Sequence, residues 1–183
     1  MSLSLRSVVI PTMLRGLTSL DGLLVAAQEF CQASGKSEST LMAARLSPTM
    51  LDFTRQVQMA TDEARNGVAR LTGTTAPPFP DSEHDIDALR GRVANTFEYV
   101  ESVPMDAFDN ATDRRIDQGY RGESRSMLAE HYLWSVLIPN FAFHLGTANA
   151  ILVKSGAHMA PLMSAHALDA VLDRYEAIRT GST

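Results

Sequence analysis

In each of two pairs of polar side chains, the members stand four residues apart on helices that the sequence predicts for an apolar bundle. Asn140 and His144 form one pair, and Gln58 and Asp62 form the other. Residues four apart share one face of a helix, so each pair presents its polar groups together. A histidine near a carboxylate can act as a general base or acid. We therefore expect Asp62 to orient or charge His144, which would act on a small molecule held between the helices.

Three more observations extend this candidate site. Gln56 and Gln58 lie about 90° to one side and about 115° to the other side of the apolar stripe of their helix, so both could reach inward. Arg45 precedes that helix and could clamp a carboxylate, although binding a loop carbonyl or a nearby acid is commoner for such an arginine. The candidate catalytic residue is His144, and the candidate ligand-binding residues are Asn140, Gln58, Asp62, Gln56 and Arg45.

The same polar residues also have a structural interpretation. Buried polar groups in a helical bundle form hydrogen bonds that fix the register of the helices or a dimer contact. The sequence gives His144 no accompanying nucleophile, second carboxylate or glycine-rich phosphate loop. Whether the protein is an enzyme therefore stays open, and the alternative is a non-catalytic dimeric helical protein.

The histidine spacing argues against a metal. A histidine-bound transition metal needs about three converging imidazoles, two of them usually four residues apart on one helix. Residue 148 is alanine, and His131 stands about 220° away from His144 on a continuous helix. His158 and His166 are expected to be exposed to solvent. We predict that the three-histidine metal site is not formed and expect no cofactor, while a divalent metal bound in another way stays open.

The apolar periodicity predicts the helices that position these residues. Steps of three and four predict helices over residues 7–34, 47–71, 85–104 and 127–155, the second capped by Ser47 and the third by Asp85. Asp81 and Glu83 are expected to assist the entry into the third helix. Residues 106–125 predict a loop or a short hairpin. A further amphipathic helix is expected around 168–178.

The longest uncharged stretch tests whether the protein is soluble. Tyr132 to Val153 is 22 residues without Asp, Glu, Lys or Arg, which is long enough to span a membrane. Its internal polar residues and the lack of a polybasic flank favour instead a central helix that is the most buried element of the bundle.

Composition predicts the class of protein. The 183 residues with net charge −5 indicate one soluble domain, residues 1–183, and disfavour nucleic acid as a partner. The N-terminus lacks the features of a signal peptide. Cys31 is the one cysteine, and its apolar neighbours predict a small core residue. A cytoplasmic protein without a membrane partner fits these features best.

Three segments resemble a known family. Residues 45–73, RLSPTMLDFTRQVQMATDEARNGVARLTG, resemble the pattern RLxPDMxxLxxQVQxAxDxAKxxxARLxG of the domain of unknown function 1993 family. Residues 137–156, LIPNFAFHLGTANAILVKSG, are similar to its LPNFYFHxxTAYxILRxxG. The connecting piece PPFPDSEHDIDALRGRVANTFEYVESV resembles its FxDxExTFxELxxRIxxT segment.

This resemblance covers residues 3–156 and implies an all-α, DinB-like four-helix bundle. Residues 157–183 lie beyond the resemblance, as a C-terminal extension that carries the additional amphipathic helix. Many DinB-like proteins bind a divalent metal through histidines and commonly form homodimers, so the resemblance implies a homodimer. Thr49 and Ala142 depart from the family pattern, which has Asp and Tyr there. Thr49 would still cap a helix, whereas Ala142 would leave space beside Asn140 and His144.

Overall fold

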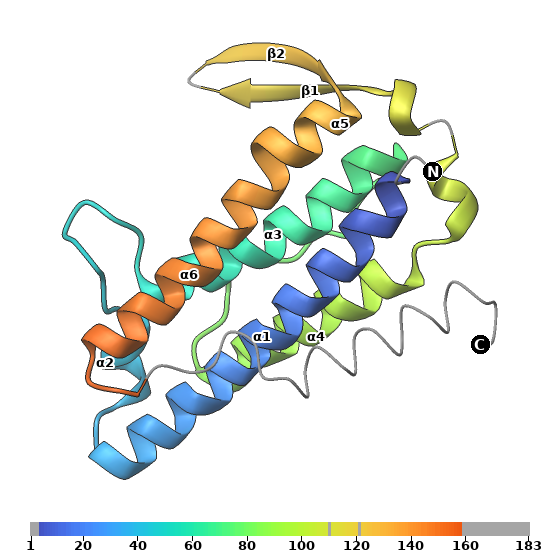
Figure 1. The fold of residues 1–183 in the computed structure, drawn as a ribbon. Coiled ribbons are helices and arrows are strands. Elements are labelled where there is room, and N and C mark those ends of the chain that lie inside the picture. Colours follow the sequence, from blue (N-terminus) through green and yellow to red (C-terminus); the bar gives the residue numbers. More distant parts are fainter. Residues whose placement is uncertain (1–3, 110, 121, 159–183) are drawn as a thin grey trace.

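The protein is an all-α bundle, as the sequence predicts. The computed structural model describes residues 4–109, 111–120 and 122–158. Four long helices run side by side in the bundle (Figure 1): α1 (Leu5–Ser34), α3 (Phe53–Thr72), α4 (Ile86–Ser102) and α6 (Ile138–Lys154). Helix α3 packs against both α4 and α6, and α1 packs mainly against α4. The expected C-terminal helix over 168–178 and His166 lie outside the described residues.

The core forms where the apolar stripes of these helices meet. Two glycines let helices approach closely, because a Cβ atom at Gly16 would overlap the ring of Phe141 and one at Gly67 would overlap Leu137. Cys31 is buried, as predicted. The largest fully buried side chains are Tyr132, Phe53, Met13, Leu17, Leu20, Leu23, Leu24, Leu71, Ile86, Leu89, Leu133 and Leu137.

Helix α3 begins later than the sequence indicates. Asp52, not Ser47, is its N-cap, and the Asp52 carboxylate accepts a hydrogen bond from the Arg55 amide at 2.9 Å. Residues 43–52 instead form a loop behind α2 (Glu38–Met42), and the Phe53 amide donates to the Ala44 carbonyl. The expected caps at Ser47 and Thr49 are therefore wrong, whereas Asp85 caps α4 as predicted.

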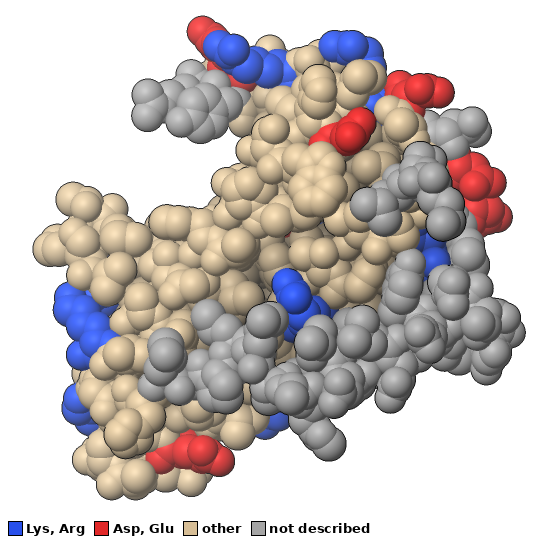
Figure 2. All heavy atoms as spheres, viewed as in Figure 1, with Lys and Arg blue, Asp and Glu red and all other residues tan. Residues whose placement is uncertain are grey.

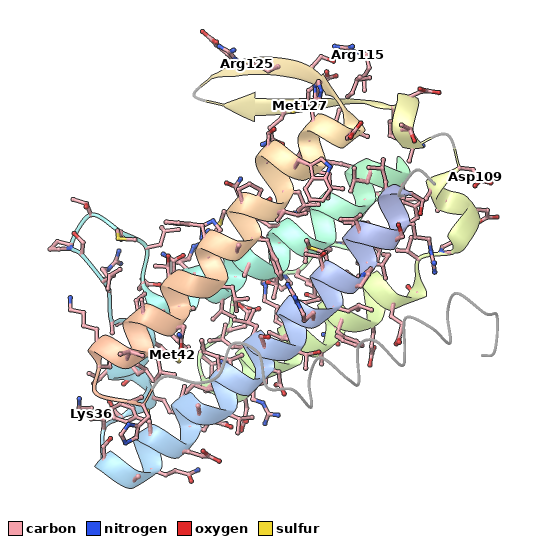
Figure 3. The ribbon with its side chains drawn as sticks, in the orientation of Figure 1. Lys36, Met42, Asp109, Arg115, Arg125 and Met127 are labelled. Carbon is pink, nitrogen blue, oxygen red and sulfur yellow. The ribbon has the colours of Figure 1, made fainter. Side chains whose placement is uncertain are left out.

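A two-stranded antiparallel hairpin covers one end of the bundle. Strand β1 (Arg115–Tyr120) pairs with β2 (Glu123–Leu128), which confirms the hairpin alternative for residues 106–125. Two short 3-10 helices, η1 (Met105–Phe108) and η2 (Ala111–Asp113), lead into it. Arg115, Arg125 and Met127 mark this end in Figure 3, and Lys36 and Met42 mark the opposite end.

The last described helix is continuous but irregular. Helix α5 (Ala129–Tyr132) passes through a π-helical turn, labelled η3 (Leu133–Leu137), into α6. The π turn lies immediately before Pro139, whose missing N–H and bulky ring disturb the hydrogen bonds of the preceding turn. Proline therefore restarts the helix without breaking it.

Helix α6 is not the most buried element, contrary to the sequence-based expectation. Phe143 and Val153 of α6 are 55% and 41% exposed, and Trp134 of the preceding η3 turn is 50% exposed. One side of α6 packs on α1 and α3, and its outer side carries apolar residues that no described helix covers. Helices Leu5–Ser34 and Ala129–Lys154 are each long and apolar enough to cross a membrane by length and composition; 56% and 44% of their apolar windows are buried in the bundle.

Candidate functional site

The expected histidine site forms at the seam between α3 and α6. His144 Nδ1 lies 2.7 Å from Gln56 Oε1, and the Gln56 amide nitrogen faces the Leu51 carbonyl at 3.4 Å. Because the amide nitrogen donates to that carbonyl, Gln56 presents its oxygen to the imidazole. His144 therefore donates from Nδ1–H, and its Nε2 carries the lone pair.

Burial controls the charge of His144. The ring is half-buried, and desolvation lowers its pKa below the ordinary 6.5. The Phe143 ring meets it edge-on, with 5.2 Å between ring centroids. The histidine is therefore neutral near pH 7 and has the character of a hydrogen-bond acceptor or weak base.

The same seam continues along α3 at heptad spacing. Gln56, Glu63 and Arg70 are seven residues apart, so they lie on nearly one line of the helix and all face the α5–α6 side. Glu63 Oε1 lies 3.5 Å from the Asn140 amide nitrogen, and Arg70 donates to the Tyr132 hydroxyl at 3.0 Å.

Glu63 is the least satisfied member of this seam. Its Oε2 is buried and has no hydrogen-bond partner among the described residues. Desolvation raises the pKa of this carboxyl, opposed by the charge of Arg70 and the contact with Asn140, and reinforced by Asp62. Sequence reasoning missed Glu63, although its distance of seven residues from Gln56 was a visible signal.

Gln58 and Asp62 do not join His144. They lie on the other side of the α3 stripe, where the Asp62 carboxylate accepts from both Arg65 and Arg92 at 2.7 Å. Gln58 donates to Glu83 at 2.7 Å. The expected pairing of Asp62 with His144 is therefore wrong, because the two residues face different neighbouring helices.

Arg92 of α4 is the centre of this second cluster. Its side chain is 2% exposed, and it donates to Thr61 at 2.7 Å and to Glu83 at 2.9 Å. Glu83 is largely buried, which raises its pKa, but hydrogen bonds from Arg92 and Gln58 outweigh this effect and the net pKa is lowered. Every charged side chain of this cluster has an oppositely charged or hydrogen-bonding partner, although Arg65 Nε is buried without one, and this is the arrangement of a structural network.

The cluster holds the proline-rich segment that joins α3 to α4. Arg65 donates to the Pro77 carbonyl and Arg92 to the Pro80 carbonyl. The two guanidinium carbons lie 4.6 and 5.8 Å from the centre of the Phe79 ring. Asp81 pairs with Arg55 and Arg92. Asp81 and Glu83 therefore fasten this segment instead of assisting the entry into α4, which corrects the sequence-based expectation.

Arg45 makes the two structural contacts that were the alternative to ligand binding. It donates to the Met50 carbonyl at 2.7 Å and pairs with Asp52 at 2.9 Å. Lys154 at the end of α6 binds the carbonyls of Arg45 and Leu46. Arg45 thus closes the loop before α3 and lies outside the His144 seam.

These contacts limit the chemistry of the site. Within residues 4–109, 111–120 and 122–158, no group of three or more His, Cys, Asp or Glu side chains is placed to hold a metal ion. Asn140 is exposed beside Glu63, and Ala142 is exposed on the outer side of α6 instead of opening a space beside His144. The seam offers one neutral imidazole and one half-buried carboxyl.

The Arg92 cluster joins two of the three segments that resemble the family pattern. Gln58 and Asp62 come from the first segment, and the partners of that cluster, Phe79, Glu83 and Arg92, come from the connecting piece. Sequence reasoning missed the role of Arg92. A signal was available, because the family segment FxDxExTFxELxxRIxxT contains both the glutamate matched by Glu83 and the arginine matched by Arg92.

Comparisons with known proteins agree with this architecture. Residues 5–160 match the family model described as "Domain of unknown function (DUF1993)". A crystal structure of a DinB family member protein from Shewanella denitrificans is similar, with a TM-score of 0.77 and 30% sequence identity, covering 87% of this chain and 88% of that one. No curated protein matches the sequence. The chain therefore belongs to the DUF1993 family and has the fold of a DinB family member.

Proposed function

We propose that the protein functions as a homodimer of helical bundles, in which the outer side of α6 forms the interface and the polar residues at its seams are structural. The observation that carries the proposal is the apolar outer side of α6, which exposes Phe143 and Val153, with half-exposed Trp134 in the preceding η3 turn. Figure 2 shows the surface over this helix almost free of acidic and basic side chains. Large exposed apolar patches mark interaction surfaces.

The chemistry of this face favours a second copy of the chain. A twofold dimer pairs the same patch with itself, so every charge in the patch would meet a like charge near the axis. Residues Tyr132 to Val153 carry no Asp, Glu, Lys or Arg, so the α6 face meets its own copy without repulsion. Leu46 and Leu51 in the loop before α3, and Leu128 just before α5, are exposed as well.

The centre of the face admits a closely packed helix. Ala142, Gly146 and Ala150 are spaced by four residues and line one side of α6. A Cβ atom at Gly146 would meet nothing within 4 Å, in contrast to Gly16 and Gly67. Ala142 and Gly146 of this line also border a groove between α6 and α1, whose α1 side consists of Thr12, Arg15, Gly16 and Ser19. Small residues beside larger apolar ones suit close helix–helix contact.

Sedimentation equilibrium of the full chain tests this proposal. We expect the wild-type protein to have twice the 19.9 kDa mass of one chain at micromolar concentration. Gly146→Glu should be monomeric, because it places a charge in the centre of the interface. Gly22→Glu is the matched control: Gly22 is also exposed in a long helix with nothing within 4 Å, and this variant should stay dimeric.

Two results would overturn the proposal. One is a monomeric wild-type protein, including the case in which it floats with phospholipid vesicles and thus uses the α6 face for a membrane. The other is a Gly146→Glu variant that dimerises as tightly as Gly22→Glu.

A second candidate function is supported by the tautomer of His144. With Nδ1–H held by Gln56, Nε2 is a neutral acceptor that could bind a hydrogen-bond donor of a small molecule or remove its proton. Diethyl pyrocarbonate, which modifies neutral imidazoles, tests this. His144 should react, with exposed His84 as the reference, and an inert His144 would contradict the candidate.

A further inference from the structure

Glu63 places a titratable group beside the proposed dimer face. Its contact partner, Asn140, is exposed on α6, one turn from His144 and adjacent in the helix to the exposed Phe143 side of α6. Asn140 lies about 60° around α6 from Phe143 and about 120° from Gly146, so a partner helix seated on α6 would meet Asn140 at the rim of the contact. There it would narrow the access of water to the carboxyl below Asn140. Burial of a carboxylate is costly unless hydrogen bonds replace its hydration.

The described groups around Glu63 leave its charge poorly compensated. Arg70 of α3 is the cation whose charge reaches it, but the Arg70 guanidinium donates to the Tyr132 hydroxyl. Asp62 on the same helix adds a like charge, although it pairs with Arg65 and Arg92. From α6, the facing groups are the Asn140 amide, at a long 3.5 Å, and the neutral His144 one turn away.

We propose that protonation of Glu63 strengthens dimerisation through the α6 face. The inference rests on the proposed function and adds that the strength of dimerisation depends on pH. In the monomer the carboxylate keeps part of its hydration, whereas in the dimer it would lose more while its buried Oε2 still lacks a donor. A protonated carboxyl avoids this cost, so the dimer takes up protons when it forms.

The direction of the pH dependence follows from two groups. The pKa of Glu63 is already raised by burial in the single chain, and burial by a partner would raise it further, so acidification should tighten the dimer. His144 acts in the opposite sense at lower pH, because burial lowers its pKa and its protonation would place a cation in the interface. Dimerisation should therefore be strongest in mildly acidic solution.

The test is the dimer dissociation constant of the full chain, measured by sedimentation between about pH 8 and about pH 5.5. Each unit by which dimerisation raises the pKa of Glu63 tightens association at low pH by up to about tenfold for each copy of the residue. Because the twofold dimer holds two copies, we expect up to about a hundredfold tighter association at the lower pH. Glu63→Gln should associate at pH 8 about as tightly as the acidified wild type and should change little with pH. Glu98→Gln, at an exposed site on α4, should follow the wild type.

The outcomes separate this inference from the proposed function. A wild-type dimer whose dissociation constant is independent of pH, or a Glu63→Gln variant that keeps the wild-type pH dependence, would overturn the inference and leave the dimer standing. A protein that is monomeric throughout the range would overturn both. Circular dichroism checks that the variant folds, and Glu63→Met provides a second neutral side chain with the same expected result.

Discussion

Individual side chains in this protein take their roles from the helix they face, more than from their spacing in the sequence. Gln56 and Gln58 are two residues apart and lie on opposite sides of the α3 stripe. Gln56 therefore meets His144 of α6, and Gln58 meets Glu83 and Arg55 beside α4. The sequence predicts these angles, but it does not say which helix lies on each side, and that is why the expected Asp62–His144 pair failed.

The lowered pKa of His144 predicts a specific pH dependence of stability. Its pKa in the folded protein lies below the value of 6.5 for a free histidine, so the unfolded chain binds more protons between these two values. The free energy of unfolding should fall as the pH drops below about 6.5, towards the folded pKa. His144→Gln should lose that part of the pH dependence in urea titrations, and exposed His158→Gln should keep it. Identical curves for His144→Gln and the wild type would contradict the prediction.

The buried arginine makes a separate prediction. Arg92→Met would leave Asp62 with Arg65 as its donor and Glu83 with Gln58, and removing one partner of a buried ion pair costs about 3–5 kcal/mol. Arg90→Met, on the same helix, breaks the half-exposed pair with Asp21 and should cost less than about 1 kcal/mol. Denaturant unfolding measures both values, and similar losses would show that the Arg92 cluster contributes no more than a surface pair.

At the scale of elements, sequence patterns predicted the helices better than their ends. The helices over 7–34 and 85–104 are found at Leu5–Ser34 and Ile86–Ser102. The start of α3 was missed because Ser47 and Asp52 are both suitable N-caps. The choice between them depends on long-range contacts: the Phe53 amide binds Ala44, and Lys154 of α6 holds the carbonyls of the loop.

Close helix approach predicts how two glycines will respond to substitution. Gly67→Ala should destabilise the protein by about 1–3 kcal/mol, because the new methyl group would overlap Leu137 where α3 meets the η3 turn. Gly22→Ala should instead stabilise it by about 0.5–1 kcal/mol, since Gly22 is exposed on α1 with nothing within 4 Å. Thermal unfolding compares the two variants. A neutral Gly67→Ala would mean that α3 and η3 can separate at little cost.

At the scale of the whole molecule, the sequence predicted an all-α bundle and the family correctly, but it misjudged α6. A helix that is apolar nearly all round is predicted to be fully buried. A single sequence does not distinguish a side that packs within the chain from a side that contacts another molecule. The exposure of Phe143 and Trp134 makes that distinction.

Trp134 provides an intrinsic signal for association, because it is the one tryptophan of the chain and is half-exposed in the η3 turn that leads into α6. We expect its emission to shift to longer wavelength on dilution, as the dimer dissociates and water reaches the indole. The Gly146→Glu variant should show the shifted spectrum at every concentration. An emission maximum of the wild type that is independent of concentration, while sedimentation reports dissociation, would place Trp134 outside the interface.

The most direct test of the dimer face is an isotope-filtered nuclear Overhauser experiment on a mixture of ¹³C-labelled and unlabelled full-length chains. Only contacts between two protomers give signals in such a sample. The proposed interface predicts cross-protomer contacts among the Ala142, Ala150 and Val153 methyl groups and the Phe143 ring. A dimer whose cross-protomer contacts come from α4, with none from α6, would contradict the central claim.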